Sequence, residues 1–176
     1  MADSKLDYTQ HFDAVMRILT SRGLLLGTYD AAGKANLMTI GWGSLGSILG
    51  IPQWIVLVRP SRYTYRCIEH FNSFTVNVPT EAMSNACALC GSKSGRDTDK
   101  FAGCHLDVEK SPCVLAPRIA QSPLVYDCQV VHSNDILPSK LADEILRGAY
   151  VDGDFHRLYF GKILAVRATG DAAKLL

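Results

Sequence analysis

The order of apolar and polar positions predicts short strands joined by turns, with a few small helices. Apolar residues at positions 15, 16, 18 and 19 share one face of a helix, so an amphipathic helix is expected over 13–20, ended by Ser21-Arg22-Gly23. Apolar runs rich in β-formers and bounded by turn residues predict strands at 24–29, 36–42, 54–58, 73–78, 124–132 and 158–166. Further helices are expected at 63–70, 81–89 and 141–147, and the polar segment 91–103 is expected to form a functional loop.

These elements favour a mainly β fold, in which small helices are attached to a β-barrel. The spacing is too irregular for alternating βαβ units. No Gly-x-Gly-x-x-Gly sequence follows a strand, which argues against a Rossmann nucleotide site. A chain of 176 residues without repeats or low-complexity linkers is expected to form one domain, residues 1–176.

Composition and charge narrow the function classes. The formal net charge of +1 predicts no electrostatic binding of nucleic acid or of an anionic membrane. The apolar stretch 45–58 is too short and too interrupted to span a bilayer. The polar start, Met1 to Asp7, is unlike a secretory signal, so the six cysteines are expected to be reduced and the protein to be cytoplasmic.

The segment Arg59-Pro-Ser-Arg-Tyr-Thr64, between a predicted strand and a predicted helix, carries residue types that bind phosphate. Arg59 and Arg62 supply positive charge, Ser61 and Thr64 supply hydroxyls, and the helix start supplies N–H groups with a favourable dipole. The same pattern also fits a surface turn with solvated arginines, in which Ser61 caps the helix. Both interpretations stay open on spacing alone.

The segment Asn36-Leu-Met-Thr-Ile-Gly-Trp-Gly43 is a strand interrupted by glycines. Strand alternation places Met38 and Trp42 on one face and Thr39 on the other. Glycines in a strand allow a flat ligand or another backbone to approach closely. Alternatively, Gly41 and the next glycine only mark a bulge or bend of the barrel, and taken alone this segment favours that interpretation.

A third segment, Cys90-Gly-Ser-Lys-Ser-Gly-Arg-Asp-Thr-Asp-Lys-Phe101, combines flexible backbone with hydroxyls and lysines. The candidates for binding an anion or the edge of a flavin are Ser92, Lys93, Ser94 and Lys100. A lysine near the flavin would stabilise the negative charge of the reduced ring. The alternative is an exposed loop whose Arg96 and neighbouring acids pair with one another for little energy.

Cysteine and histidine positions raise two further hypotheses. Cys87, Cys90, Cys104 and His105 resemble half of a zinc site, but a second Cys-x-x-Cys is missing, so buried free thiols are favoured and no metal is predicted. His156, before the last predicted strand, is a candidate hydrogen-bond or proton donor near a reacting ring. A histidine at a strand end more often bonds a backbone group.

Taken together, these segments resemble the flavin reductase-like, FMN-binding family that includes flavoredoxin. The resemblance covers roughly 13–166 and rests on the joint order of the three segments with Phe74-Thr-Val-Asn-Val78 and the weaker His156-Arg-Leu-Tyr-Phe-Gly161. It implies a split β-barrel that binds FMN non-covalently near the interface of a homodimer. Family members often continue the last block with Gly-Glu, where this chain has Gly161-Lys162.

The resemblance also implies roles for individual residues. Met38, Thr39 and Trp42 would lie along the isoalloxazine, the arginine-containing turn would hold the phosphate and ribityl chain, and Asn77 would reach the ribityl chain or the ring edge. The full set of implied cofactor-binding residues is Asn36, Met38, Thr39, Trp42, Arg59, Ser61, Arg62, Tyr63, Thr64, Asn77, Cys90, Gly91, Ser94 and Lys100.

The function implied is that of an oxidoreductase whose flavin carries the redox chemistry. A nicotinamide donor, NADH or NADPH, would pass a hydride to flavin N5, and electrons would leave to flavin, iron, oxygen or a protein partner. His156 is the candidate catalytic residue. The alternatives are an FMN-dependent electron-transfer protein that does not use NAD(P)H directly, a flavin- or haem-binding module without turnover, and a structural zinc module.

Overall fold

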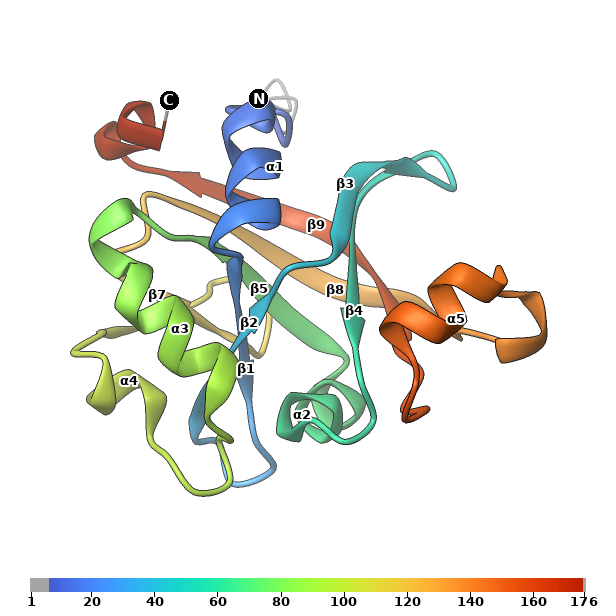
Figure 1. The fold of residues 1–176 in the computed structure, drawn as a ribbon. Helices are drawn as coiled ribbons and strands as arrows, with labels where there is room; N and C mark the ends of the chain where they lie inside the picture. The colour runs from blue at the N-terminus through green and yellow to red at the C-terminus, as the bar shows by residue number, and fades with distance from the viewer. Residues whose placement is uncertain (1–6, 176) are drawn as a thin grey trace.

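The computed structural model describes residues 7–175 and has nine strands and five α-helices there. The start of the polar N-terminal segment, residues 1–6, lies outside this range. In chain order the elements are α1 (Phe12–Ser21), β1 (Leu24–Tyr29), β2 (Ala35–Ile40), β3 (Gly43–Ile48), β4 (Ile51–Val58), α2 (Tyr63–Phe71), β5 (Ser73–Val78), η1 (Glu81–Met83), α3 (Ser84–Ser92), α4 (Lys100–Gly103), β6 (Val108–Lys110), β7 (Pro117–Ile119), β8 (Leu124–Asp135), η2 (Pro138–Lys140), α5 (Asp143–Ala149), β9 (Arg157–Ala168) and η3 (Gly170–Leu175) (Figure 1).

Seven strands form one antiparallel sheet in the order β2-β1-β5-β8-β9-β4-β3, and β6 pairs with β7 separately. The long strands β8 and β9, 12 residues each, form the centre of the sheet and pair along their length with two register shifts. Figure 1 shows the hairpin β3–β4 projecting from the body, while α2 begins at the far end of β4. Because Asn36 near the start of β2 donates a hydrogen bond to Thr64 in the first turn of α2, β2 and the β4–α2 turn are brought to one site.

The main apolar core is formed by the sheet and α1. The apolar face of α1 is buried against large side chains of the strands, which include Trp54, Phe74, Tyr126 and Tyr159. A second cluster packs α3 and α4 against the sheet and contains Leu25, Leu37, Met83, Cys87, Cys90, Phe101 and Ile119. This second cluster fixes α3 and the loop after it beside β2, so the candidate segments lie on an ordered framework.

Most predicted elements are confirmed within a few residues, and the exceptions have local causes. β3 was not expected, because Gly-Ser-Leu-Gly-Ser-Ile has few β-formers. The strand is stabilised by pairing with β4 along its whole length, from Gly43 to Ile48. β6 and β7 are three residues each, too short to give a periodic pattern. The loop predicted over 91–103 ends in the short helix α4, whose first turn is capped by Asp99 accepting a hydrogen bond from the Ala102 N–H.

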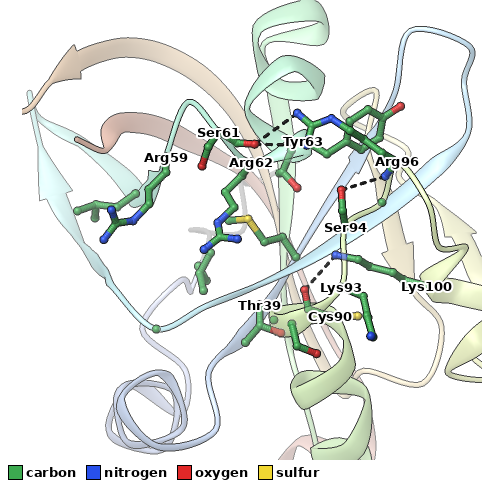
Figure 2. A pocket seen from close by; sticks show the side chains of 18 of the residues that line it. Thr39, Arg59, Ser61, Arg62, Tyr63, Cys90, Lys93, Ser94, Arg96 and Lys100 are labelled. Carbon is green, nitrogen blue, oxygen red and sulfur yellow. Dashed lines mark hydrogen bonds between the residues drawn. The ribbon is translucent and has the colours of Figure 1, made fainter. Parts of the chain in front are cut away.

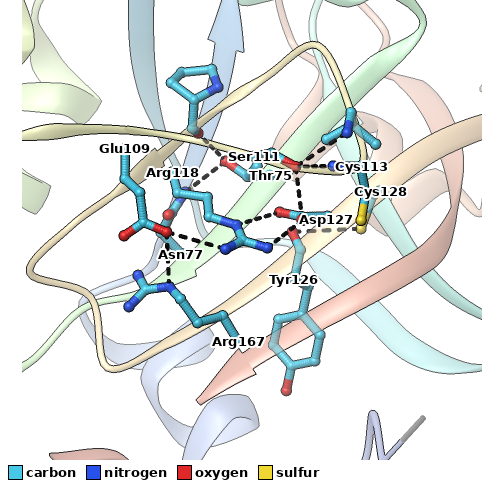
Figure 3. A network of polar contacts seen from close by, with 12 residues as sticks. Thr75, Asn77, Glu109, Ser111, Cys113, Arg118, Tyr126, Asp127, Cys128 and Arg167 are labelled. Carbon is cyan, nitrogen blue, oxygen red and sulfur yellow. Dashed lines mark hydrogen bonds and ion pairs between the residues drawn. The ribbon is translucent and has the colours of Figure 1, made fainter. Parts of the chain in front are cut away.

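A polar network ties the small β6–β7 sheet to the main sheet (Figure 3). Arg118 on β7 forms a bidentate pair with the fully buried Asp127 on β8, with Nε–Oδ1 and Nη2–Oδ2 distances of 2.9 and 2.5 Å. Asp127 also accepts a hydrogen bond from Ser111, and Glu109 bridges Arg118 to Arg167 on β9. The charges in this network are therefore paired rather than isolated.

Within residues 7–175, no helix combines the length and the apolar character that crossing a membrane requires.

Candidate functional site

A pocket of about 340 Å³ opens between the end of β2, the β4–α2 turn, and the segment from the end of α3 to α4 (Figure 2). This volume is in the range of small-molecule sites. The described residues that line it include five cations and no Asp or Glu. They are Met38, Thr39, Ile40, Gly41, Trp42, Leu57, Arg59, Ser61, Arg62, Tyr63, Thr64, Cys90, Gly91, Ser92, Lys93, Ser94, Gly95, Arg96, Lys100 and His156.

Twelve of the fourteen predicted cofactor-binding residues, together with His156, line this pocket, and two do not. Asn77 is fully buried in β5, where its amide donates to the Leu25 carbonyl and to Thr75 and accepts from the Ile119 N–H. Its polar atoms are used in joining strands, so the predicted contact with a ribityl chain or ring edge is not supported.

Asn36 also lies behind the pocket surface rather than on it. It is buried on β2 and donates hydrogen bonds to Thr28 and, at 2.9 Å, to Thr64. Thr64 does line the pocket, at the first turn of α2. Asn36 therefore orients a lining hydroxyl instead of meeting a ligand itself.

Arg62 is the cation best placed to meet an anion. It precedes α2, and Figure 2 shows its side chain extending from the turn into the space facing Thr39 and Cys90. No hydrogen bond or ion pair joins its guanidinium to any residue within 7–175. An arginine left without a protein partner at a helix start is suited to a phosphate or carboxylate.

Arg59 and Ser61, by contrast, are already bonded to the segment after α5. The Arg59 guanidinium donates to the carbonyls of Ala149, Gly153 and Asp154, at distances of 2.8–3.4 Å. The Ser61 hydroxyl and N–H both donate to the Asp154 carboxylate. These two residues wall the pocket and hold the segment that leads to His156.

Arg96 was not among the predicted site residues, yet it closes one side of the pocket. Its guanidinium donates to the Ser61 carbonyl at 3.3 Å and lies over the Tyr63 ring, 5.4 Å from the ring centroid. Tyr63 in turn donates to Asp30 at 3.0 Å. The pattern of alternating charges suggested pairing within the loop, and only the fold reveals that Arg96 reaches the β4–α2 turn instead.

Lys100 is buried and binds backbone carbonyls rather than a carboxylate. Its Nζ donates to the Leu37 carbonyl at 2.7 Å and to the Cys90 carbonyl at 3.0 Å, which joins β2 to the end of α3. Figure 2 shows the bond to Cys90. Burial is the main cause that lowers the pKa of Lys100. The ammonium adds positive character to this end of the pocket while it fixes the wall.

Cys90 lines the pocket but its thiol is not chemically activated. Its side chain is buried, and burial, with a further contribution from Cys104, raises the pKa of Cys90 to about 12. No group of three or more His, Cys, Asp or Glu side chains within residues 7–175 could hold a metal ion. The zinc hypothesis, which required Cys87 and Cys104 as ligands, finds no support.

An aromatic cluster forms the other end of the pocket. Trp42, almost half exposed, lies 5.0 Å from His156 between ring centroids, and the Tyr150 hydroxyl lies 2.7 Å from His156 Nδ1. Burial, followed by the positive charge of Arg59, lowers the pKa of His156 to about 4. The imidazole is therefore neutral at physiological pH.

This shift gives a prediction about stability. We expect the free energy of unfolding to fall as pH decreases from about 6.5 towards 4, because the unfolded chain binds a proton at His156 that the folded chain refuses. The stabilising contribution of the neutral His156 is complete above the pKa of His156 in the unfolded chain, about 6.5. It is lost as the pH falls from there to the folded-state pKa of about 4. Urea unfolding at about pH 7 and about pH 5 should show a smaller acid-induced loss in His156→Gln than in the unaltered chain. Equal losses would contradict the expectation.

The chain is similar in sequence and in fold to proteins of one family. The family model for the flavin reductase like domain matches residues 16–176. The uncharacterized protein YddH of Escherichia coli (strain K12) is 28% identical over 123 residues, which cover 69% of this chain and 61% of YddH, so the chain spans less than two thirds of that relative. The flavoredoxin of Desulfovibrio vulgaris (Miyazaki F) is 25% identical with a TM-score of 0.68 and 84% and 69% of the two chains covered.

The flavoredoxin of Methanosarcina acetivorans is 28% identical, also with a TM-score of 0.68, over 84% of this chain and 68% of that one. The family match and the likeness to a putative flavin reductase with split barrel domain from Shewanella frigidimarina NCIMB 400 (19% identity, TM-score 0.68) confirm the predicted mainly β, split-barrel fold. Because the family model matches residues 16–176, nearly the whole chain, this chain belongs to the flavin reductase-like family.

Proposed function

We propose that the chain binds FMN in this pocket and acts as an oxidoreductase. The observation that carries the proposal is the charge of the pocket: five cations and no described carboxylate line it, and the Arg62 guanidinium has no hydrogen-bond or ion-pair partner among residues 7–175. A cofactor with a dianionic phosphate and a flat, polar ring fits such a wall. A neutral or cationic ligand would leave these charges uncompensated.

The lining residues divide into two groups that match the two parts of FMN. Arg62, Thr64 and Lys93 offer a guanidinium, a hydroxyl and an ammonium to the phosphate and ribityl chain. Met38 and Trp42, with the backbone around Gly91, offer apolar and amide surfaces to the ring. The Thr39 hydroxyl donates to the Cys87 carbonyl, so Thr39 contributes shape rather than a free donor.

When bound, FMN would supply the redox chemistry that the side chains themselves lack. The chain's own residues would hold the cofactor and shield it from solvent. The cations along the pocket, the buried Lys100 and the exposed Arg62 in particular, favour negative charge inside it. No lining side chain is an activated nucleophile, since the Cys90 thiol stays protonated.

Two versions of this function differ in the electron donor. In a reductase, NADH or NADPH donates directly; in an electron-transfer protein, another protein does. The likeness to two flavoredoxins, at 25% and 28% identity, supports the electron-transfer version. Family membership supports the first.

We expect the FMN-loaded chain to lose its yellow absorption band when NADH or NADPH is added without oxygen. The measurement compares the rate of bleaching with that of the same concentration of free FMN, which controls for the uncatalysed reaction. A band that persists with both donors would exclude the reductase version. Reduction by dithionite and reoxidation by a protein acceptor would then support the electron-transfer version.

A further inference from the structure

We propose that Tyr150 is a positioning residue that holds His156 as a neutral Nε2–H donor towards the pocket, so that the site selects a second ligand carrying a carbonyl. This ligand preference rests on the proposed function, whereas the state of the imidazole does not. Tyr150 is not among the site residues predicted from the sequence, and it does not line the pocket. It lies six residues before His156 in the chain.

The hydrogen bond between the two side chains fixes which ring nitrogen carries the proton. The Tyr150 hydroxyl and His156 Nδ1 are 2.7 Å apart, and both residues are buried. A buried hydroxyl hydrogen requires an acceptor, and Nδ1 is the acceptor found for it among the described residues. Nδ1 must then be unprotonated, and the neutral ring carries its hydrogen on Nε2.

Tyr150 is itself held in place by its neighbours. Its ring stacks on Phe155 with the centroids 4.9 Å apart, and the Arg59 guanidinium lies 5.1 Å from its centroid. Arg59 also donates to the carbonyl of Ala149, the residue before Tyr150. Because these contacts fix the ring, the hydroxyl is presented to Nδ1 in one direction.

The neutral state is favoured by the charges that face His156. Arg59 and Arg62 both disfavour an imidazolium, and the Asp154 carboxylate opposes them only partly. Burial acts in the same direction as the two arginines. The group therefore remains a donor with one hydrogen at Nε2 over the physiological range.

The direction of this donor follows from which residues line the pocket. His156 lines the pocket, its Nδ1 is used by Tyr150, and its Nε2 has no hydrogen-bond partner within residues 7–175, so Nε2 is the ring nitrogen available to a ligand. The half-exposed ring of Trp42 lies beside it. One donor next to an aromatic face suits a planar ring with a carbonyl substituent, such as an aromatic carboxamide.

The first test reads the imidazole directly in the flavin-free chain. Long-range 15N–1H NMR of the unaltered protein should show His156 with a protonated Nε2 and an unprotonated, hydrogen-bonded Nδ1. In Tyr150→Phe, the Nδ1 resonance should move downfield, towards that of a nitrogen without a donor. Tyr65→Phe, which removes a hydroxyl elsewhere, should leave both nitrogens unchanged. A protonated Nδ1 in the unaltered chain, or an unchanged Nδ1 in Tyr150→Phe, would overturn the proposal.

The second test concerns the ligand and uses the FMN-loaded chain. Perturbation of the flavin absorption by nicotinamide and by 3-methylpyridine, which lacks the carbonyl, gives the two dissociation constants. We expect the preference for nicotinamide to fall by up to about tenfold in Tyr150→Phe, the equivalent of one hydrogen bond. No preference in the unaltered chain, or an unchanged preference in the variant, would refute the carbonyl selectivity. Failure to load FMN would refute the proposed function instead and leave the NMR result standing.

Discussion

Replacing Arg62 with alanine is expected to raise the dissociation constant for FMN by about 10- to 150-fold. This corresponds to about 1.5–3 kcal/mol, the contribution of a hydrogen bond to a charged group. The effect is large because the Arg62 guanidinium has no partner within residues 7–175 that would have to be given up when phosphate binds. The folded structure should be unaffected, since Arg62 is exposed at the turn before α2.

Riboflavin provides the internal control for this measurement, because it has the ring and the ribityl chain but no phosphate. Quenching of flavin fluorescence should show nearly equal riboflavin affinity in Arg62→Ala and the unaltered chain. Arg66→Ala, an exposed arginine on the same helix that does not line the pocket, should bind FMN normally. An Arg62→Ala chain with full FMN affinity would remove Arg62 from the phosphate site, and equal losses for both flavins would place it against the ring.

Replacing Asp127 with asparagine is expected to lower the free energy of unfolding by about 3–5 kcal/mol, which is typical of a buried ion pair that loses one partner. Asp127 is fully buried and neutralises Arg118 through two hydrogen bonds. Without the charge of Asp127, the partly exposed Glu109 is the one counterion that Arg118 keeps in the part of the chain that the structure describes. A loss of this size is a large fraction of the stability of an ordinary domain.

Urea unfolding followed by circular dichroism would measure this loss, with two variants that set the scale. Ser111→Ala removes the hydrogen bond to Asp127 and the two that the hydroxyl accepts from the Cys113 and Val114 N–H groups, and should cost about 1–3 kcal/mol without leaving a charge unpaired. Asp143→Asn breaks the exposed pair with Arg147 on α5 and should change stability by less than about 0.5 kcal/mol. If Asp127→Asn were as mild as Asp143→Asn, the network would not contribute to holding β6–β7 on the main sheet.

Local sequence patterns determined most elements and the position of the candidate site. The turn after β1 is specified by adjacent residues: Asp30 accepts from the N–H groups of Ala32 and Lys34, and Gly33 adopts a positive φ of 79°. The strand-to-helix segment 59–64 is likewise a local feature, as is the amphipathic face of α1. Such signals are readable because the interacting groups are neighbours in the chain.

What each site residue does was decided only by tertiary contacts. The Asn77 amide could bind a ligand, but in the fold it donates to the Leu25 carbonyl and accepts from the Ile119 N–H, 52 and 42 positions away. The Arg59 guanidinium is likewise bound by carbonyls 90–95 positions away, which leaves Arg62 as the uncommitted cation of the same turn. The sequence therefore determined which residue types gather around the pocket, and the packing of distant segments decided which of their polar atoms remain available, because a hydrogen bond used inside the fold cannot also be given to a ligand.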